Sequence, residues 1–350
     1  MKTKRTIKLL LVCILVIFFM PSSVALAGEN GCTIATYPHL ERIHNEKPNT
    51  IDLLVLGDSF VYRSFSPLVY WKEKQITSYA LGAPAQPAWL SYYQLLDALE
   101  YQKPKVVVLE INELFSKPIG LKVRMSKVIN SLQSENVRLQ AIHDASSNFN
   151  SADKRMLLEN HTQQNHQETM NKIAPEDSER VEPIGFKGYF LNVNVSPLAP
   201  IERNYMSRVN AELPMNENGK EYIEKIISLC KKHNIQLLFV KFPTIEWATS
   251  KAEVAKKFAN DNKILFFDLN TDMKSFTIDW NVDSYDGGNH MNDFGAQKVT
   301  KEMAEYLEEH TKLSPTTSQE VKDAFDASYK IYEEQRKIMI ESNDDEDAIQ

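Results

Sequence analysis

Short apolar runs alternate with amphipathic helical segments along most of the chain from residue 51 onward. Short apolar runs are typical of strands buried on both faces, and helical segments between them supply the crossovers of a parallel sheet. The pattern predicts strands at about 51–56, 77–81, 105–109, 236–240 and 263–269. It predicts helices at about 67–74, 88–101, 219–233, 246–260 and 293–309. We therefore expect an α/β fold whose parallel sheet is covered by helices on both faces.

This alternation stops between about residues 124 and 182, in a polar stretch that permits helix. We interpret the stretch as a helical insertion in a main domain that spans residues 28–311. Residues 312–350 form a separate C-terminal segment, with a predicted helix over about 319–340 and then a run of acids over 341–347. A run of acids without bases is typical of a solvated, frayed tail.

The first residues resemble a secretory signal. A basic start is followed by an apolar run over 9–20 and by Ala25-Leu26-Ala27, which matches an A-x-A cleavage site. Residues 1–27 are thus expected to be a signal peptide, and the mature chain would begin at Gly28. The alternative is an uncleaved membrane anchor over residues 7–27, although twelve apolar residues cover only about 18 Å of helix. Both readings place the rest of the chain outside the cytoplasm, secreted or at the cell surface, with a bacterial-type signal.

Charge and cysteine content exclude some classes of function. The formal net charge is -7, and no Lys/Arg-rich stripe lies beyond the first residues, which argues against a nucleic-acid-binding protein. Cys13 lies in the apolar run, so Cys32 and Cys230 either pair or stay free. No Cys/His spacing suggests zinc, and we expect neither a metal nor a cofactor.

Ser59 directly follows the first predicted strand, so that its hydroxyl leaves the sheet in a turn. Near the end of the main domain, Asp286 and His290 lie four residues apart around a Gly-Gly-Asn turn. A serine hydroxyl becomes a nucleophile when an imidazole accepts its proton and a carboxylate holds that imidazole in the right tautomer. The three residues are candidates for such a triad, with Asp286 rather than the more distant Asp283 as the orienting acid. The other seven histidines lack such partners, and we expect them at the surface.

Four short blocks, in this order, resemble the SGNH, or GDSL-type, family of hydrolases and acyltransferases. Gly57-Asp58-Ser59 matches the nucleophile turn of the family, and Gly82 ends the second predicted strand, where the family has a glycine. The third block, Glu110-Ile111-Asn112-Glu113, keeps the asparagine of the family's Gly-x-Asn-Asp but replaces the glycine and the aspartate. The fourth block has one residue more between Asp286 and His290 than the family's Asp-x-x-His. The resemblance covers about residues 51–311 without the insertion.

This resemblance implies a three-layer α/β/α sandwich around a flavodoxin-like sheet, the SGNH hydrolase fold. It also implies that Ser59 attacks an acyl group, while the histidine and aspartate of the triad move its proton and orient the base. The N–H groups of Ser59 and Gly82 and the amide of Asn112 would form the oxyanion hole. Asp58 we interpret as a structural residue that holds the turn through backbone hydrogen bonds.

The function implied is ester chemistry on acyl, especially O-acetyl, groups of cell-surface glycans or wall polymers, by way of an acyl-serine. Two alternatives stay open. An O-acyltransferase would use the same triad to modify an exopolysaccharide or wall polymer. A non-catalytic surface binding protein would have kept the sheet and lost turnover; the altered third block is the best support for that interpretation, and the intact serine and histidine argue against it.

Overall fold

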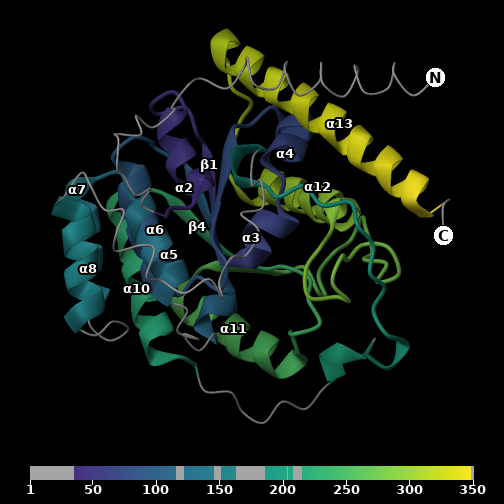
Figure 1. Ribbon diagram of the computed structural model, residues 1–350. Helices are drawn as coiled ribbons and strands as arrows, with labels where there is room; N and C mark the ends of the chain where they lie inside the picture. Colours follow the sequence, from purple (N-terminus) through teal and green to yellow (C-terminus); the bar gives the residue numbers. More distant parts are fainter. Residues whose placement is uncertain are drawn as a thin grey trace.

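The computed structural model describes residues 35–115, 122–145, 151–162, 186–202, 204–207 and 215–347 (Figure 1). Within them five parallel strands form one sheet in the order β2-β1-β3-β4-β5. The strands are β1 (Leu53–Gly57), β2 (Ser78–Gly82), β3 (Val106–Glu110), β4 (Gln236–Lys241) and β5 (Leu265–Asp268). This is the strand order of flavodoxin-like doubly wound sheets, so the expected fold class is confirmed.

Helices cover both faces of the sheet. They are α3 (Ser59–Ser64), α4 (Pro67–Lys74), α5 (Ala88–Leu99), α10 (Glu217–Lys232), α11 (Thr249–Asn262) and α12 (Asp293–His310). Figure 1 shows α5 and α10 on one side of the strands and α3, α4 and α12 on the other. Strands β1, β2 and β3 are buried at every position, as strands enclosed on both faces must be.

Local signals in the sequence set several helix ends. Ser66 caps α4 by accepting a hydrogen bond from the backbone N–H of Val69, and Pro67 occupies the first turn. At the other end Gln75 adopts a left-handed conformation, with φ of 54°. Asn292 caps α12 by accepting from the N–H of Gly295. This cap fixes the end of the loop that carries His290.

The carboxyl ends of the strands meet at one edge of the sheet. Gly57 at the end of β1 pairs in register with Gly82 at the end of β2. Glu110 ends β3, one residue beyond Leu109, which pairs with Leu56 of β1. Ligands of open α/β sheets bind at this edge, next to the point where the strand order reverses. The first three sequence blocks are therefore adjacent in space.

The C-terminal helix α13 (Gln319–Asp347) continues through the acidic run, where the sequence suggested a frayed tail. Its apolar side chains pack against the main body, with Phe325 1% exposed and Tyr332 fully buried. The indole N–H of Trp71 also donates to Asp326 Oδ1 at 2.8 Å. The packing of α13 along α4 is visible in Figure 1. The helix thus packs on the main body through its earlier turns, and it extends beyond the expected 319–340 into residues such as Glu341 and Ser342 that are exposed.

The described part of the expected insertion is helical. It comprises α6 (Lys122–Ser131), α7 (Glu135–Asp144) and α8 (Ser151–Thr162). The remaining short helices are α2 (Pro38–Glu41), η1 (Arg42–Asn45), η2 (Ile111–Leu114), η5 (Phe186–Gly188), η6 (Pro200–Glu202) and η7 (Tyr205–Ser207). The other insertion residues lie outside the described residues, and the division of the chain into 1–27, 28–311 and 312–350 stays a prediction.

The expected signal segment and Cys32 also lie outside the described residues. Among the helices that the structure does describe, none has the length and apolar character to span a bilayer. The Cys230 thiol is free and buried, and burial raises its pKa to about 12.

Candidate active site

Ser59 is the first residue of α3, directly after the turn that ends β1. Gly57 in this turn has φ of 152°, and a Cβ there would lie 2.7 Å from Glu110 Cβ. Only glycine fits so close an approach. The Asp58 carboxylate caps α3 by accepting from the N–H of Phe60 at 3.0 Å. This cap is the structural role expected for Asp58, and it leaves the half-buried Ser59 at the edge of the sheet.

The structure brings Ser59, His290 and Asp286 together. Ser59 Oγ lies 2.9 Å from His290 Nε2, and His290 Nδ1 lies 2.6 Å from Asp286 Oδ2. The other Asp286 oxygen accepts the backbone N–H of His290 at 2.8 Å. Although burial opposes it, the bonds from His290 lower the pKa of the Asp286 carboxyl. A serine hydroxyl, an imidazole and an ionised carboxylate in line have the geometry of a nucleophile, a base and an orienting acid.

The extra residue in the fourth block is accommodated by a tight loop. Gly287 and Gly288 have φ of 74° and 100°, conformations that favour glycine. Ser284, fully buried, holds this loop with its hydroxyl: it donates to the carbonyl of His290 at 2.9 Å and accepts the N–H of Gly288 at 2.7 Å. The longer spacing thus still directs the carboxylate of Asp286 at the imidazole.

Asp283 lies elsewhere. Its fully buried carboxylate accepts from Lys298 Nζ at 2.6 Å and from the backbone N–H of Asp279 at 2.6 Å. The carboxylate therefore ties the loop to α12. Of the two acids, Asp286 is the one whose carboxylate the structure places on the imidazole of His290.

The two other expected oxyanion residues lie beside the nucleophile turn. A Cβ on Gly82 would come within 2.6 Å of the Asp58 carbonyl oxygen, so the backbones of the two turns are in contact. Asn112 Nδ2 donates to Asp58 Oδ2 at 3.1 Å. An amide group has two N–H donors, so this bond leaves one to be directed at a substrate oxygen. That these groups stabilise an oxyanion stays a prediction.

Aromatic side chains surround the imidazole. The Phe60 ring lies 5.1 Å from the ring of His290, and the Tyr285 ring lies 6.0 Å away and nearly parallel to it. The guanidinium of Arg63, one turn after Ser59 on α3, lies 4.7 Å from the Tyr285 ring. Its charge helps to lower the pKa of Asp286. Sequence reasoning missed Arg63, because only the fold places it near Asp286.

Sequence reasoning also missed His39, which it placed at the surface. The side chain is 2% exposed, and His39 Nε2 lies 2.7 Å from the carbonyl oxygen of Gly82. Burial lowers the pKa of His39 to about 4, while the bond to Gly82 opposes this shift. The neutral ring therefore donates from Nε2 and holds the turn after β2. No local pattern indicates this contact, because the partners are 43 residues apart.

The free energy of unfolding is expected to depend on the titration of His39. The unfolded chain binds a proton near pH 6.5 and the folded chain only near pH 4, so the stability present above pH 6.5 is lost as the pH falls toward 4. Complete titration corresponds to about 3 kcal/mol. Urea unfolding from pH 4 to 7.5 should show a steeper loss in the wild type than in His39→Gln, whose amide cannot titrate. Parallel curves for the two proteins would contradict the buried, neutral state of His39.

The described residues contain no group of three or more His, Cys, Asp or Glu that could hold a metal ion. In the turn from Asp268 to Asp272, which holds two carboxylates, the Asp268 carboxylate accepts from the N–H of Asn270 and from the indole of Trp247. The expectation that the chemistry needs no metal or cofactor stays a prediction.

Comparison with known proteins yields matches among solved structures. No family model and no curated protein matches the chain. The chain is similar to a GDSL-like lipase from Bacteroides thetaiotaomicron VPI-5482, with 11% identity over 79% of this chain and 99% of that one, and a TM-score of 0.36. It is also similar to a lipase/acylhydrolase from Enterococcus faecalis, with 13% identity over 77% of this chain and 100% of that one, and a TM-score of 0.32.

The strand order and the positions of the four sequence blocks in this chain, rather than these matches, indicate the SGNH-type fold. Identities this low concern the fold alone, and TM-scores below 0.5 leave the activity to be argued from the residues of this chain.

Proposed function

We propose that the protein is an extracytoplasmic serine esterase of the SGNH type, which cleaves O-acyl esters, above all O-acetyl esters, of cell-surface glycans through an acyl-serine intermediate. The observation that carries this proposal is the hydrogen-bonded line from Ser59 Oγ through His290 to Asp286, with distances of 2.9 and 2.6 Å. Each distance lies within hydrogen-bond reach, as nucleophilic catalysis by serine requires.

In the first half of the reaction, Ser59 Oγ bonds to the acyl carbon while His290 Nε2 takes the hydroxyl proton. The carbonyl oxygen becomes an oxyanion, and the N–H groups of Ser59 and Gly82 and the amide of Asn112 stabilise it. The intermediate then collapses, the ester C–O bond breaks, and His290 returns the proton to the departing sugar hydroxyl. Ser59 is left acylated and the imidazole neutral.

In the second half, water takes the place of the sugar. His290 accepts a proton from the water as its oxygen bonds to the acyl carbon, and Ser59 Oγ leaves with that proton, releasing the free acid. The side chain of His290 is 22% exposed, which gives water access to the base. This exposure is our reason to prefer hydrolysis to transfer.

The glycan substrate and the location rest on the sequence. The basic start, the apolar run and the Ala25-Leu26-Ala27 site support export, and export restricts the substrates to extracytoplasmic material. An uncleaved segment over residues 7–27 would keep the enzyme at the membrane. That surface members of the family act on acylated glycans is an analogy at the level of fold.

The acceptor distinguishes this proposal from its closest alternative, an O-acyltransferase with the same triad. A transferase must hold a sugar hydroxyl near the acyl-serine and exclude water until it arrives. With 4-nitrophenyl acetate as donor, we expect free acetate to form at the same rate with and without added oligosaccharides of wall polymers. Acetylated sugar that accumulates faster than free acetate would establish the transferase instead.

A further inference from the structure

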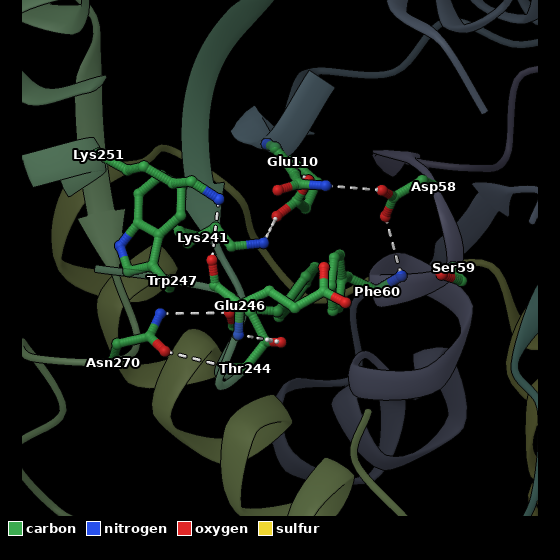
Figure 2. A network of polar contacts seen from close by, with 12 residues as sticks. Asp58, Ser59, Phe60, Glu110, Lys241, Thr244, Glu246, Trp247, Lys251 and Asn270 are labelled. Carbon is green, nitrogen blue, oxygen red and sulfur yellow. Dashed lines mark hydrogen bonds and ion pairs between the residues drawn. The ribbon is translucent and has the colours of Figure 1, made fainter. Parts of the chain in front are cut away.

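The third sequence block departs from the family pattern at Glu110, and the structure shows what this residue contacts. Glu110 Oε1 accepts from Lys241 Nζ at 2.6 Å, and both side chains are fully buried. Glu110 ends β3 and Lys241 ends the neighbouring strand β4. Figure 2 shows the Lys241 side chain directed at the Glu110 carboxylate, with Asp58 and Phe60 beside them. The ion pair thus lies next to the nucleophile turn.

The ammonium group of Lys241 is held by aromatic faces as well as by the carboxylate. It lies 3.8 Å from the centre of the Phe60 ring and 5.3 Å from that of Trp247. Phe60 follows Ser59 directly, and its ring also contacts the imidazole of His290. Cation–π contacts strengthen when the cation is removed from water. Lys241 therefore has a fixed position against the residue that follows the nucleophile.

The second oxygen of Glu110 acts on the expected oxyanion donor. Glu110 Oε2 accepts the backbone N–H of Asn112 at 2.7 Å, and the Asn112 side chain donates to Asp58 at 3.1 Å. Asn112 is thus held at two points, its backbone by Glu110 and its amide by Asp58. Gly57 allows this arrangement, because any larger residue there would meet Glu110 Cβ.

Stability alone does not account for a buried pair of this kind. Burial raises the pKa of the Glu110 carboxyl, and the charge of Lys241 together with the N–H of Asn112 opposes this shift. A buried ion pair is weak evidence for stability, since well-packed apolar residues of similar size are often as good or better. A specific contact made by the pair is a better explanation, and the structure shows one, the hydrogen bond from the backbone N–H of Asn112 to Glu110 Oε2.

We propose that Glu110 and Lys241 are positioning residues of the oxyanion hole. Lys241 holds the Glu110 carboxylate, Glu110 holds the backbone of Asn112, and the amide N–H that Asp58 does not use is thereby directed at the oxyanion. This inference rests on the proposed function. It explains how the block works without the glycine that the family pattern has at position 110.

Two double variants isolate this contact. E110Q/K241M and E110M/K241M both lack the two charges, but only the first keeps a side-chain oxygen that can accept the N–H of Asn112. We expect kcat for 4-nitrophenyl acetate to be about 100-fold lower in E110M/K241M than in E110Q/K241M, with KM nearly equal. The inhibition constant of benzeneboronic acid, which forms a tetrahedral adduct with an active serine, should rise by a similar factor. Melting temperatures would check that both variants fold, and E110L/K241M would give the same comparison if E110M/K241M does not fold.

Asn112→Ala serves as the benchmark in these assays. A large loss in Asn112→Ala, together with equal kcat and equal inhibition constants in the two double variants, would overturn the positioning role alone. Normal kcat and normal boronic acid inhibition in Asn112→Ala would overturn the oxyanion role of Asn112, and the positioning role with it. The two failures are therefore distinguishable.

Discussion

Ser59→Ala is expected to reduce kcat for 4-nitrophenyl acetate by about 10⁵- to 10⁶-fold, because the alanine removes the atom that forms the acyl-enzyme. The remaining rate should come from the oxyanion donors and from substrate binding alone. Initial rates would quantify the loss if they are measured at an enzyme concentration high enough for the enzymatic rate to exceed the spontaneous hydrolysis of the ester. The melting temperature should hardly change, since Ser59 is half-buried and its side chain does not support the core.

Ser64→Ala is a matched control for this substitution. Ser64 belongs to the same helix α3 and is fully buried, and its hydroxyl has no hydrogen-bond partner among the described residues. Its replacement should leave the rate intact. A loss in Ser64→Ala as large as that in Ser59→Ala would show that the rate reports the integrity of α3 rather than a nucleophile.

Asp286→Asn is expected to reduce kcat by about 10⁴-fold, because an amide in this place favours the wrong tautomer of the base. Asp286 Oδ2 accepts from His290 Nδ1 at 2.6 Å, and this bond leaves Nε2 free to take the proton of Ser59. The substitution preserves shape, so the melting temperature should fall far less than the rate. Kinetics and thermal unfolding of the same preparation would measure both.

Asp283→Asn separates this effect from a general disturbance of the loop. The Asp283 carboxylate bonds to Lys298 and to the backbone N–H of Asp279, so its loss should lower the melting temperature. Most of the activity of the folded protein should remain. The opposite ranking, with Asp283→Asn inactive and Asp286→Asn active, would contradict the assignment of the orienting acid.

The sequence predicted the layers of the fold well, because strands buried on both faces and amphipathic helices leave strong local patterns. Helix α4 begins at Pro67 and ends at Lys74, which is the range that the alternation of strand and helix segments predicted. The prediction was poorer for α13. The acids at 341–347 suggested a frayed, solvated tail, whereas the helix that begins at Gln319 continues through them. Tertiary contacts of Phe325 and Tyr332 hold the earlier turns of this helix on the main body.

The site was predictable where its residues follow strand ends. Ser59, Gly82 and Asn112 all lie just at or after such ends, and parallel strands bring their carboxyl ends together. The supporting contacts were not predictable. His39 bonds to Gly82 across 43 residues, and Lys241 bonds to Glu110 across 131. Neither pair leaves a local pattern, because each depends on strand order and on burial.

Covalent labelling by a fluorophosphonate probe tests the central claim most directly, because it reports an activated serine without knowledge of the substrate. The full-length protein should be labelled, and peptide mapping should place the adduct on Ser59. Labelling should vanish in Ser59→Ala and slow strongly in Asp286→Asn. An adduct on another serine, or labelling that persists in Ser59→Ala, would contradict the assignment. A folded wild type that is not labelled at all would instead favour a binding protein on this fold.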